Sequence, residues 1–270
     1  MTRAAIALGG NTGPVAAQLA EALQALVTRR VALVARAGLY DTTPVGSSST
    51  QRYLNSAVLV ETDLAPAELL TELQRVEQQL GRRRDVHWGP RPVDLDLIWC
   101  GEVVCETPRL TLPHPACWYR RFVLEPLAEI SPQWRHPEKG QTVEALRDRW
   151  RQRPVGIALA GGTTAWRTRL LQSPPPLSPA VRLTAWNDDR PAPDSQASLI
   201  AWRGAPPGDS VVARPRGESA DPRFQALPAD RRLDVSREAA LSDDWLTWVS
   251  QSVGDEPQRV GELDLEIGSG

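Results

Sequence analysis

The chain has 270 residues, a formal net charge of −2 and 41 % apolar residues, a composition typical of a soluble globular protein. No apolar run approaches the roughly 18 residues that a membrane span needs, and the near-neutral charge excludes the basic field that holds nucleic acid. Three cysteines without metal-type spacing favour free thiols in a reducing compartment. We therefore expect a cytoplasmic monomer with small-molecule partners, no nucleic-acid partner and no membrane partner.

Strand and helix patterns alternate along the first 150 residues. Runs rich in Val, Leu and Ala predict strands over residues 3–8, 31–40, 54–62 and 92–99. Residues 102–104 are expected to pair with the last strand across Gly101. Pro14 and Pro66 each precede an apolar stripe at helical spacing, and Gly81 is expected to end the second helix. The order β-α-β-β-α-β is that of an α+β, ferredoxin-like βαββαβ sandwich.

The chain changes character near residue 150. Residues 173–179, Ser-Pro-Pro-Pro-Leu-Ser-Pro, can continue neither a helix nor a central strand and predict a semi-rigid linker. We therefore divide the chain into a first domain, a Pro-rich linker and a C-terminal extension, with the bounds 1–153, 154–180 and 181–270. Within the extension, short apolar runs and a helical stripe favour either a small α/β unit or an appendage that packs on the first domain. The residues assign it no function.

Two acidic residues form the strongest local signal. Asp94 and Asp96 are two apart on a predicted strand, so they share a face. Adjacent carboxylates repel each other unless cations neutralise them, and Mg²⁺ suits oxygen ligands; such a pair can hold two ions across a phosphate chain. A lone D-x-D is equally often a solvated strand face. Here Leu95 and Leu97 indicate a partly buried strand, and nearby arginines indicate a polyphosphate site.

These arginines fall in the run Arg82-Arg83-Arg84 and at Arg91. A basic run after a helix is more often a solvated last turn that favours the helix dipole. The following Gly89-Pro90 indicates instead a long loop that closes over phosphates and excludes water.

Three weaker patterns accompany this site. His114 stands between two prolines in a fixed extended backbone, and we favour an anion-binding role over a structural one. Tyr53 and Asn55 share a strand face and suit a planar heterocycle, although each alone is unremarkable. Gln74 and Glu77 share a polar helix face that meets either a nucleotide or solvent.

Together the residues form a known combination. It consists of Ala7-Leu8-Gly9-Gly10-Asn11, Tyr53-Leu54-Asn55, Gly81-Arg82-x-Arg84, Trp88-Gly89-Pro90-Arg91-x-x-Asp94-Leu95-Asp96, Pro113-His114-Pro115 and Arg120-x-Phe122. This set resembles the 6-hydroxymethyl-7,8-dihydropterin pyrophosphokinase (HPPK) family of folate biosynthesis over about residues 1–150. The resemblance implies a ferredoxin-like fold and transfer of pyrophosphate from ATP to the pterin hydroxyl, giving AMP.

The resemblance also implies residue roles. Asp94 and Asp96 would hold two Mg²⁺ ions, and Arg82 and Arg91 would act with them on the transferring group. The residues implied around the co-substrate ATP are Gln74, Glu77, Arg84, Ile98, Arg109, Thr111, His114 and Arg120. Those implied around the pterin are Thr42, Val45, Tyr53, Asn55, Trp88 and Phe122, with Tyr53 and Phe122 on opposite faces of the ring.

The sequence departs from the family at two positions and leaves two other functions open. Gly10 stands where the family usually has Ser, and Thr43 stands where it commonly has Pro. One alternative is a non-catalytic pterin- or nucleotide-binding module, which the intact acidic pair disfavours. Another is an unrelated D-x-D nucleotidyltransferase, which would leave Tyr53 and Asn55 unexplained.

Overall fold

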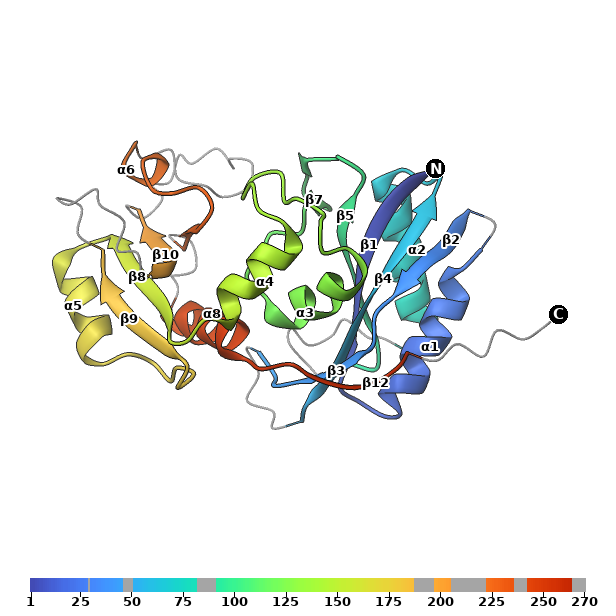
Figure 1. The fold of residues 1–270 in the computed structure, drawn as a ribbon, viewed down its shortest axis with the longest axis horizontal. Coiled ribbons are helices and arrows are strands. Elements are labelled where there is room, and N and C mark those ends of the chain that lie inside the picture. Colours follow the sequence, from blue (N-terminus) through green and yellow to red (C-terminus); the bar gives the residue numbers. More distant parts are fainter. Residues whose placement is uncertain are drawn as a thin grey trace.

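The computed structural model describes residues 1–28, 30–45, 51–81, 91–186, 197–204, 222–235 and 242–263. Two sheets lie beside one another, with helices between them (Figure 1). The elements of the first part are β1 (Thr2–Gly10), α1 (Val15–Leu26), β2 (Val31–Arg36), β3 (Leu39–Thr42), β4 (Tyr53–Thr62), α2 (Pro66–Gln79), β5 (Asp94–Cys100), β6 (Cys105–Glu106), β7 (Thr111–Leu112), α3 (Arg121–Ile130) and α4 (Val143–Arg151).

The first sheet is antiparallel and contains the strands of the predicted β-α-β-β-α-β order. Its strands lie in the order β12-β3-β4-β1-β5, where β12 is Gln258–Gly261, and β2 also pairs with β4. The single strand expected over residues 31–40 is two strands, because the Gly38 N–H donates to the Glu129 carboxylate at 2.8 Å instead of to a neighbouring strand. Both strands still pair with β4, so the chain only bends there.

Both faces of this sheet are covered. Alternate side chains of β1 point to opposite faces, so Ile6 and Leu8 pack against α1 and α2 while Ala5 packs against α3 and α4. Apolar positions at helical spacing, such as Leu23 and Leu73, are fully buried. Each such leucine stabilises the fold by about 1.5–3 kcal/mol relative to an exposed one. The two predicted amphipathic helices, α1 and α2, therefore cover the face of the sheet to which Ile6 and Leu8 point.

One predicted pairing is wrong. Residues 102–104 do not pair with β5; Gly101 has a φ of +55° and begins a turn, in which the Val103 N–H donates to the Cys100 carbonyl at 3.1 Å. The short hairpin forms later, between β6 and β7. A two-residue strand carries too little alternation to be detected in the sequence.

The second sheet is parallel, in the order β11-β10-β8-β9. The elements of this part are β8 (Val155–Gly161), α5 (Thr164–Gln172), β9 (Val181–Ala185), β10 (Ala197–Arg203), α6 (Pro222–Gln225), β11 (Arg232–Asp234) and α8 (Asp244–Gly254). The linker expected over residues 154–180 needs correction, because β8 and α5 occupy most of it. Val155, Ile157 and Leu159 are buried in a central strand. Pro154 lies directly before that strand, and the other prolines of the range fall in the connection from α5 to β9.

The two parts share one hydrophobic core. Residues of β8 and α8, such as Ile157 and Trp245, belong to the same buried cluster as Trp118 and Trp150 beside the first sheet. After α8 the chain returns to the first sheet, where β12 pairs with β3 (Figure 1). The C-terminal residues therefore complete the edge of the first sheet.

None of the helices in the described ranges is long and apolar enough to cross a membrane. The three cysteines are free, as the sequence predicts.

Candidate active site

The acidic pair lies at the start of β5. In the pairing with β1, Asp94 is opposite Gly9 and Asp96 is opposite Ala7. Both carboxylates are partly exposed, while Leu95 and its alternating neighbours are buried on the other face. Strand alternation thus brings two anionic groups to one accessible surface.

Arg91 lies directly beside this pair. Its Nη1 donates to Asp94 Oδ2 at 2.6 Å. Burial raises the pKa of the Tyr53 phenol, and the neighbouring Arg91 guanidinium opposes that shift. A cation, a carboxylate and a flat ring therefore meet where β4 and β5 begin.

Asn11 fixes the backbone of Arg91. Its Oδ1 accepts from the Arg91 N–H at 2.9 Å, and its own N–H donates to the Arg91 carbonyl at 3.1 Å. The Asn11 side chain is buried. The sequence alone assigns Asn11 no role of its own at the site, although a polar residue directly after a glycine pair at a strand end is a signal that points to one.

The two glycines before Asn11 give the loop room. A Cβ on Gly9 would lie 2.7 Å from Asn55 Oδ1, and a Cβ on Gly10 would lie 2.3 Å from the Pro92 carbonyl oxygen. Real Cβ atoms do not approach so closely. The close contact between the end of β1 and residues 91–93 therefore requires Gly10.

Glu77 differs from the expected polar helix face. Its carboxylate is buried and Oε1 accepts from the Leu95 N–H at 2.8 Å, between the two aspartates in the chain. Gln74, by contrast, is partly exposed. Glu77 thus binds the backbone of β5 and helps to position the acidic pair.

Replacing Glu77 by Leu is expected to lower the free energy of unfolding by about 1–3 kcal/mol, because the Leu95 N–H loses its acceptor. The control Glu77→Gln keeps an acceptor oxygen and should stay within about 1 kcal/mol of the parent chain. Urea denaturation measures both. Equal loss of stability in the two variants would contradict a role based on this hydrogen bond.

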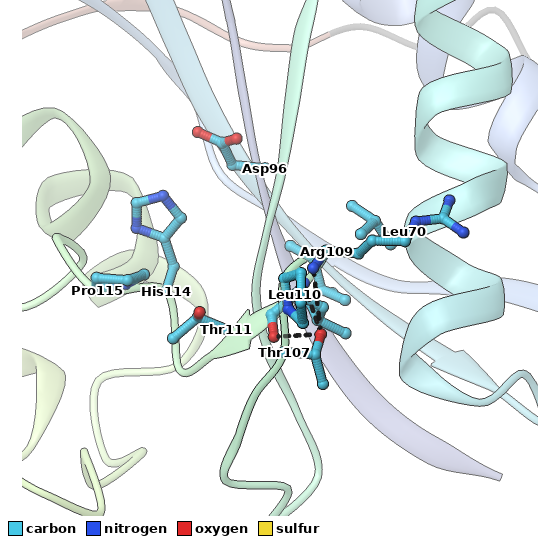
Figure 2. A pocket seen from close by; sticks show the side chains of 10 residues that line it. Leu70, Asp96, Thr107, Arg109, Leu110, Thr111, His114 and Pro115 are labelled. Atoms are coloured by element: carbon cyan, nitrogen blue, oxygen red, sulfur yellow. Dashed lines mark hydrogen bonds between the residues drawn. The ribbon is translucent and has the colours of Figure 1, made fainter. Parts of the chain in front are cut away.

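A cavity of about 280 Å³ opens beside Asp96. Figure 2 shows Asp96, Thr111 and His114 around it, with Arg109 extending toward Leu70 of α2. Its lining residues are Leu70, Asp96, Leu97, Thr107, Pro108, Arg109, Leu110, Thr111, His114 and Pro115. Three predicted ATP residues therefore share one cavity with an acidic residue.

His114 has a defined hydrogen-bonding state. Its backbone N–H donates to the Ile98 carbonyl at 2.8 Å, and its Nδ1 accepts from the Ala116 N–H at 3.2 Å. Burial and the nearby Arg120 charge lower the pKa of His114 to about 3. Because Nδ1 is an acceptor, the neutral ring carries its proton on Nε2, which makes that atom a donor near neutral pH.

Arg120 and Phe122 stand at the start of α3. The Arg120 guanidinium lies 5.6 Å from the Phe122 ring centre. Its Nε is buried, and among the described residues it has no hydrogen-bond partner. A buried donor of this kind fits an anion such as a phosphate oxygen.

A polar cluster lies on β3 and β4. Thr42 is paired with Tyr53, and the Asn55 Nδ2 donates to Thr42 Oγ1 at 2.7 Å. Asn55 and Thr42 are buried, while Tyr53 and Val45 are partly exposed. The structure thus brings Thr42, Tyr53 and Asn55 together, as the pairing of adjacent strands requires.

Four other predicted site residues are not brought to the site by their side chains, or lie outside the described ranges. The side chain of Ile98 is fully buried in the core, so only its backbone faces other groups. Arg82, Arg84 and Trp88 lie outside the described residues. Their roles stay predictions.

The donor set fits Mg²⁺ in a limited way. Within the described ranges, no group of three or more His, Cys, Asp or Glu side chains comes together as a metal site. Mg²⁺ keeps several waters and is usually held by one or two carboxylates together with substrate phosphates. Asp94 and Asp96 match that pattern and do not form an all-protein cage.

A mixed α/β domain that carries an acidic pair beside an arginine is typical of enzymes that transfer phosphate groups. The family model for 7,8-dihydro-6-hydroxymethylpterin-pyrophosphokinase (HPPK) matches residues 5–132. A Synechocystis 2-amino-4-hydroxy-6-hydroxymethyldihydropteridine pyrophosphokinase is 42 % identical over 143 residues, which cover 53 % of this chain and 73 % of the relative. The Pseudomonas aeruginosa enzyme of the same name is 39 % identical, over 53 % of this chain and 90 % of its own. The chain belongs to the HPPK family.

These matches lie in the first part of the chain, and the residues beyond them form an extra C-terminal region. A solved HPPK-DHPS structure in complex with substrates is 11 % identical, with a TM-score of 0.44 over 83 % of this chain and 61 % of its own. That likeness is too distant to describe the extra region.

Proposed function

We infer that this chain is a transferase of folate biosynthesis that moves pyrophosphate from ATP to 6-hydroxymethyl-7,8-dihydropterin. The acceptor hydroxyl oxygen bonds to the β-phosphorus, the bond from the β-phosphorus to the α-phosphate oxygen breaks, and AMP leaves; the hydroxyl proton is lost to solvent. The single observation that carries this reading is the acidic pair of β5, with Arg91 on one side and the His114 cavity on the other.

The acidic and the basic residues of the site would have different roles in this reaction. Asp94 and Asp96 would hold two Mg²⁺ ions, which when bound neutralise and polarise the phosphate chain. Arg91 and Arg82 would steady the transferring group, since phosphoryl-type transfer depends on positioning and charge neutralisation. Glu77 and Asn11 would keep these groups in place through the backbone of β5 and of Arg91.

The nucleotide would occupy the cavity beside β5. Neutral His114 would donate from Nε2. The buried Arg120 Nε–H, which has no hydrogen-bond partner among the described residues, would donate to a phosphate oxygen. The full set proposed around ATP is Gln74, Glu77, Arg84, Ile98, Arg109, Thr111, His114 and Arg120. The side chains of Glu77 and Ile98 are buried. Ile98 would therefore contact ATP through its backbone, and Glu77 would contact it only after a small movement of its side chain.

The pterin would lie at the starts of β4 and α3. Tyr53 and Phe122 would cover its faces, and Asn55 with the backbone near Thr42 and Val45 would bind its edge; Trp88 completes the set. The hydrogen bond from Asn55 to Thr42 supports this arrangement, because it fixes the amide in one orientation.

We also propose a description of the whole chain. With β2 and β3 counted as one strand, the strand order and the cover of α1 and α2 support the ferredoxin-like sandwich. The transferase domain would occupy residues 1–153, completed by β12. The protein would act in the cytoplasm as a monomer.

The test is to incubate the protein with ATP, Mg²⁺ and the hydroxymethyl-dihydropterin, and to identify the nucleotide product. AMP together with the pterin diphosphate is expected. ADP would indicate single phosphoryl transfer, free pyrophosphate would indicate a nucleotidyltransferase, and binding without turnover would indicate a non-catalytic module.

A further inference from the structure

The loop that follows β3 is bound by a residue from the far end of the chain. Thr43 donates to Asp255 Oδ1 twice, from its backbone N–H at 3.2 Å and from Oγ1 at 2.7 Å. Thr43 directly follows Thr42, one of the proposed pterin residues. Asp255 is the first residue after α8 and is buried. A residue 212 positions away in the sequence thus fixes Thr43, directly after the end of β3.

Asp255 is itself held beside α3. Its backbone carbonyl accepts from Arg121 Nη1, and Arg121 is paired with Glu125 at 2.8 Å. Arg121 is adjacent in the chain to Phe122, the proposed second cover of the pterin. Asp255 therefore connects the two segments that would border the same ligand: its side chain binds one and its backbone binds the other.

The residues after Asp255 extend this connection along the sheet edge. In β12, Gln258 is opposite Asp41 and Arg259 is opposite Tyr40, so β3 has a partner on the side away from β4. The Arg259 Nε also lies 2.9 Å from Glu129 Oε1 on α3. The returning strand keeps β3 and α3 in a fixed relation.

Burying a carboxylate costs desolvation free energy that packing alone does not offset. Burial raises the pKa of Asp255, against the effect of its hydrogen bonds with Thr43, and Oδ2 is buried with no hydrogen-bond partner among the described residues. An apolar side chain would avoid that desolvation cost. What the carboxylate supplies is an acceptor for both donors of Thr43.

We propose that Asp255 is a positioning residue for the acceptor substrate: through Thr43 and Arg121 it sets the distance between the end of β3, at Thr42 and Thr43, and the start of α3. This rests on the proposed function. It assigns the C-terminal region a task in the reaction, namely to order one side of the acceptor site while leaving the nucleotide side unchanged.

The experiment uses the full-length chain with Asp255→Ala, Asp255→Asn and Thr43→Val. Asp255→Ala should raise the KM for the pterin about tenfold and leave the KM for ATP within about twofold, because only the acceptor side loses its contact. Asp255→Asn keeps an acceptor oxygen and should largely restore the parent value. Adding Thr43→Val to Asp255→Ala should have little further effect, since both changes remove the same hydrogen bond.

The matched control is Glu256→Ala. Glu256 follows Asp255, is mostly exposed, and its side chain pairs with Arg153 at 3.5 Å. It should leave both KM values unchanged. Equal increases in both KM values, or an unchanged pterin KM in Asp255→Ala, would overturn the proposal. Should Asp255→Ala unfold, the Thr43→Val chain decides the question: it loses the Oγ1 hydrogen bond and keeps the N–H one, so a smaller rise in the pterin KM with an unchanged ATP KM is expected, and an unchanged pterin KM overturns the proposal.

A second readout does not depend on turnover. Hydrogen exchange of the Thr43 amide, followed by NMR, should accelerate in Asp255→Ala and stay slow in Glu256→Ala, because the amide loses its acceptor. Unchanged exchange would refute the contact itself. Failure of the proposed function would instead be visible in the parent chain, as a product other than AMP.

Discussion

Replacing Asp96 by alanine is expected to reduce pyrophosphate transfer by at least about a thousandfold while the fold is retained, because the site loses one of two groups that concentrate positive charge on the phosphates. Asp96 is partly exposed, so its removal opens no core cavity. Steady-state production of AMP measures the loss, and circular dichroism verifies the fold.

Two comparisons make this prediction specific. Asp96→Asn preserves the shape of the side chain and should be almost as inactive, because the charge is what recruits Mg²⁺. The control Asp63→Asn removes an exposed carboxylate that pairs with Arg30 at 2.9 Å and should keep full activity. Mg²⁺ with an ATP analogue should raise the melting temperature of the parent chain more than that of Asp96→Asn. Activity of Asp96→Ala within about tenfold of the parent would remove the metal role.

Gly10→Ala is expected to lower the free energy of unfolding by about 1–3 kcal/mol and to reduce turnover as well. The new Cβ would lie 2.3 Å from the Pro92 carbonyl oxygen and 3.0 Å from Val15 Cγ1. Neither neighbour is the end of a flexible side chain, so the segment before Asp94 has to move. Urea denaturation and AMP production on the same preparation measure both effects.

Gly261→Ala is the matched control, since no atom of the described residues lies within 4 Å of the Cβ it would add. It should leave stability and activity unchanged. If Gly10→Ala were equally silent, the close approach of the strand end to Pro92 would have no part in positioning Asp94.

Much of the first part could be predicted from local patterns. The alternation around Asp94 and Asp96 and the helical stripes leading to Leu23 and Leu73 depend on neighbours in the chain, so the sequence alone indicates them. The hairpin at β6 escaped prediction because its two-residue strands carry too little alternation. The bend at Gly38 escaped it because the acceptor of the Gly38 N–H, Glu129, is far away in the sequence.

The fold of the C-terminal region is harder to predict from the sequence, because its elements are identified by long-range contacts. A proline-rich segment predicts a linker, but the strand before it, β8, is recognisable only once its neighbours β9 and β10 are known. Asp255 carries no local signal at all, because its role depends on Thr43 and Arg121 at long range. Glu77 is a similar case: its position on the polar face of α2 predicts exposure, but its carboxylate is buried and accepts from the Leu95 amide.

The return of the chain to the first sheet has a consequence for biosynthesis. Ribosomes deliver the N-terminal strands first, and domains begin to fold as they emerge. Asp255 and β12 follow the entire parallel sheet in the chain, so a nascent polypeptide that has exposed all of Asp94, Asp96 and His114 still lacks the contact that orders Thr43. Acquisition of full acceptor binding should therefore lag behind nucleotide binding during translation.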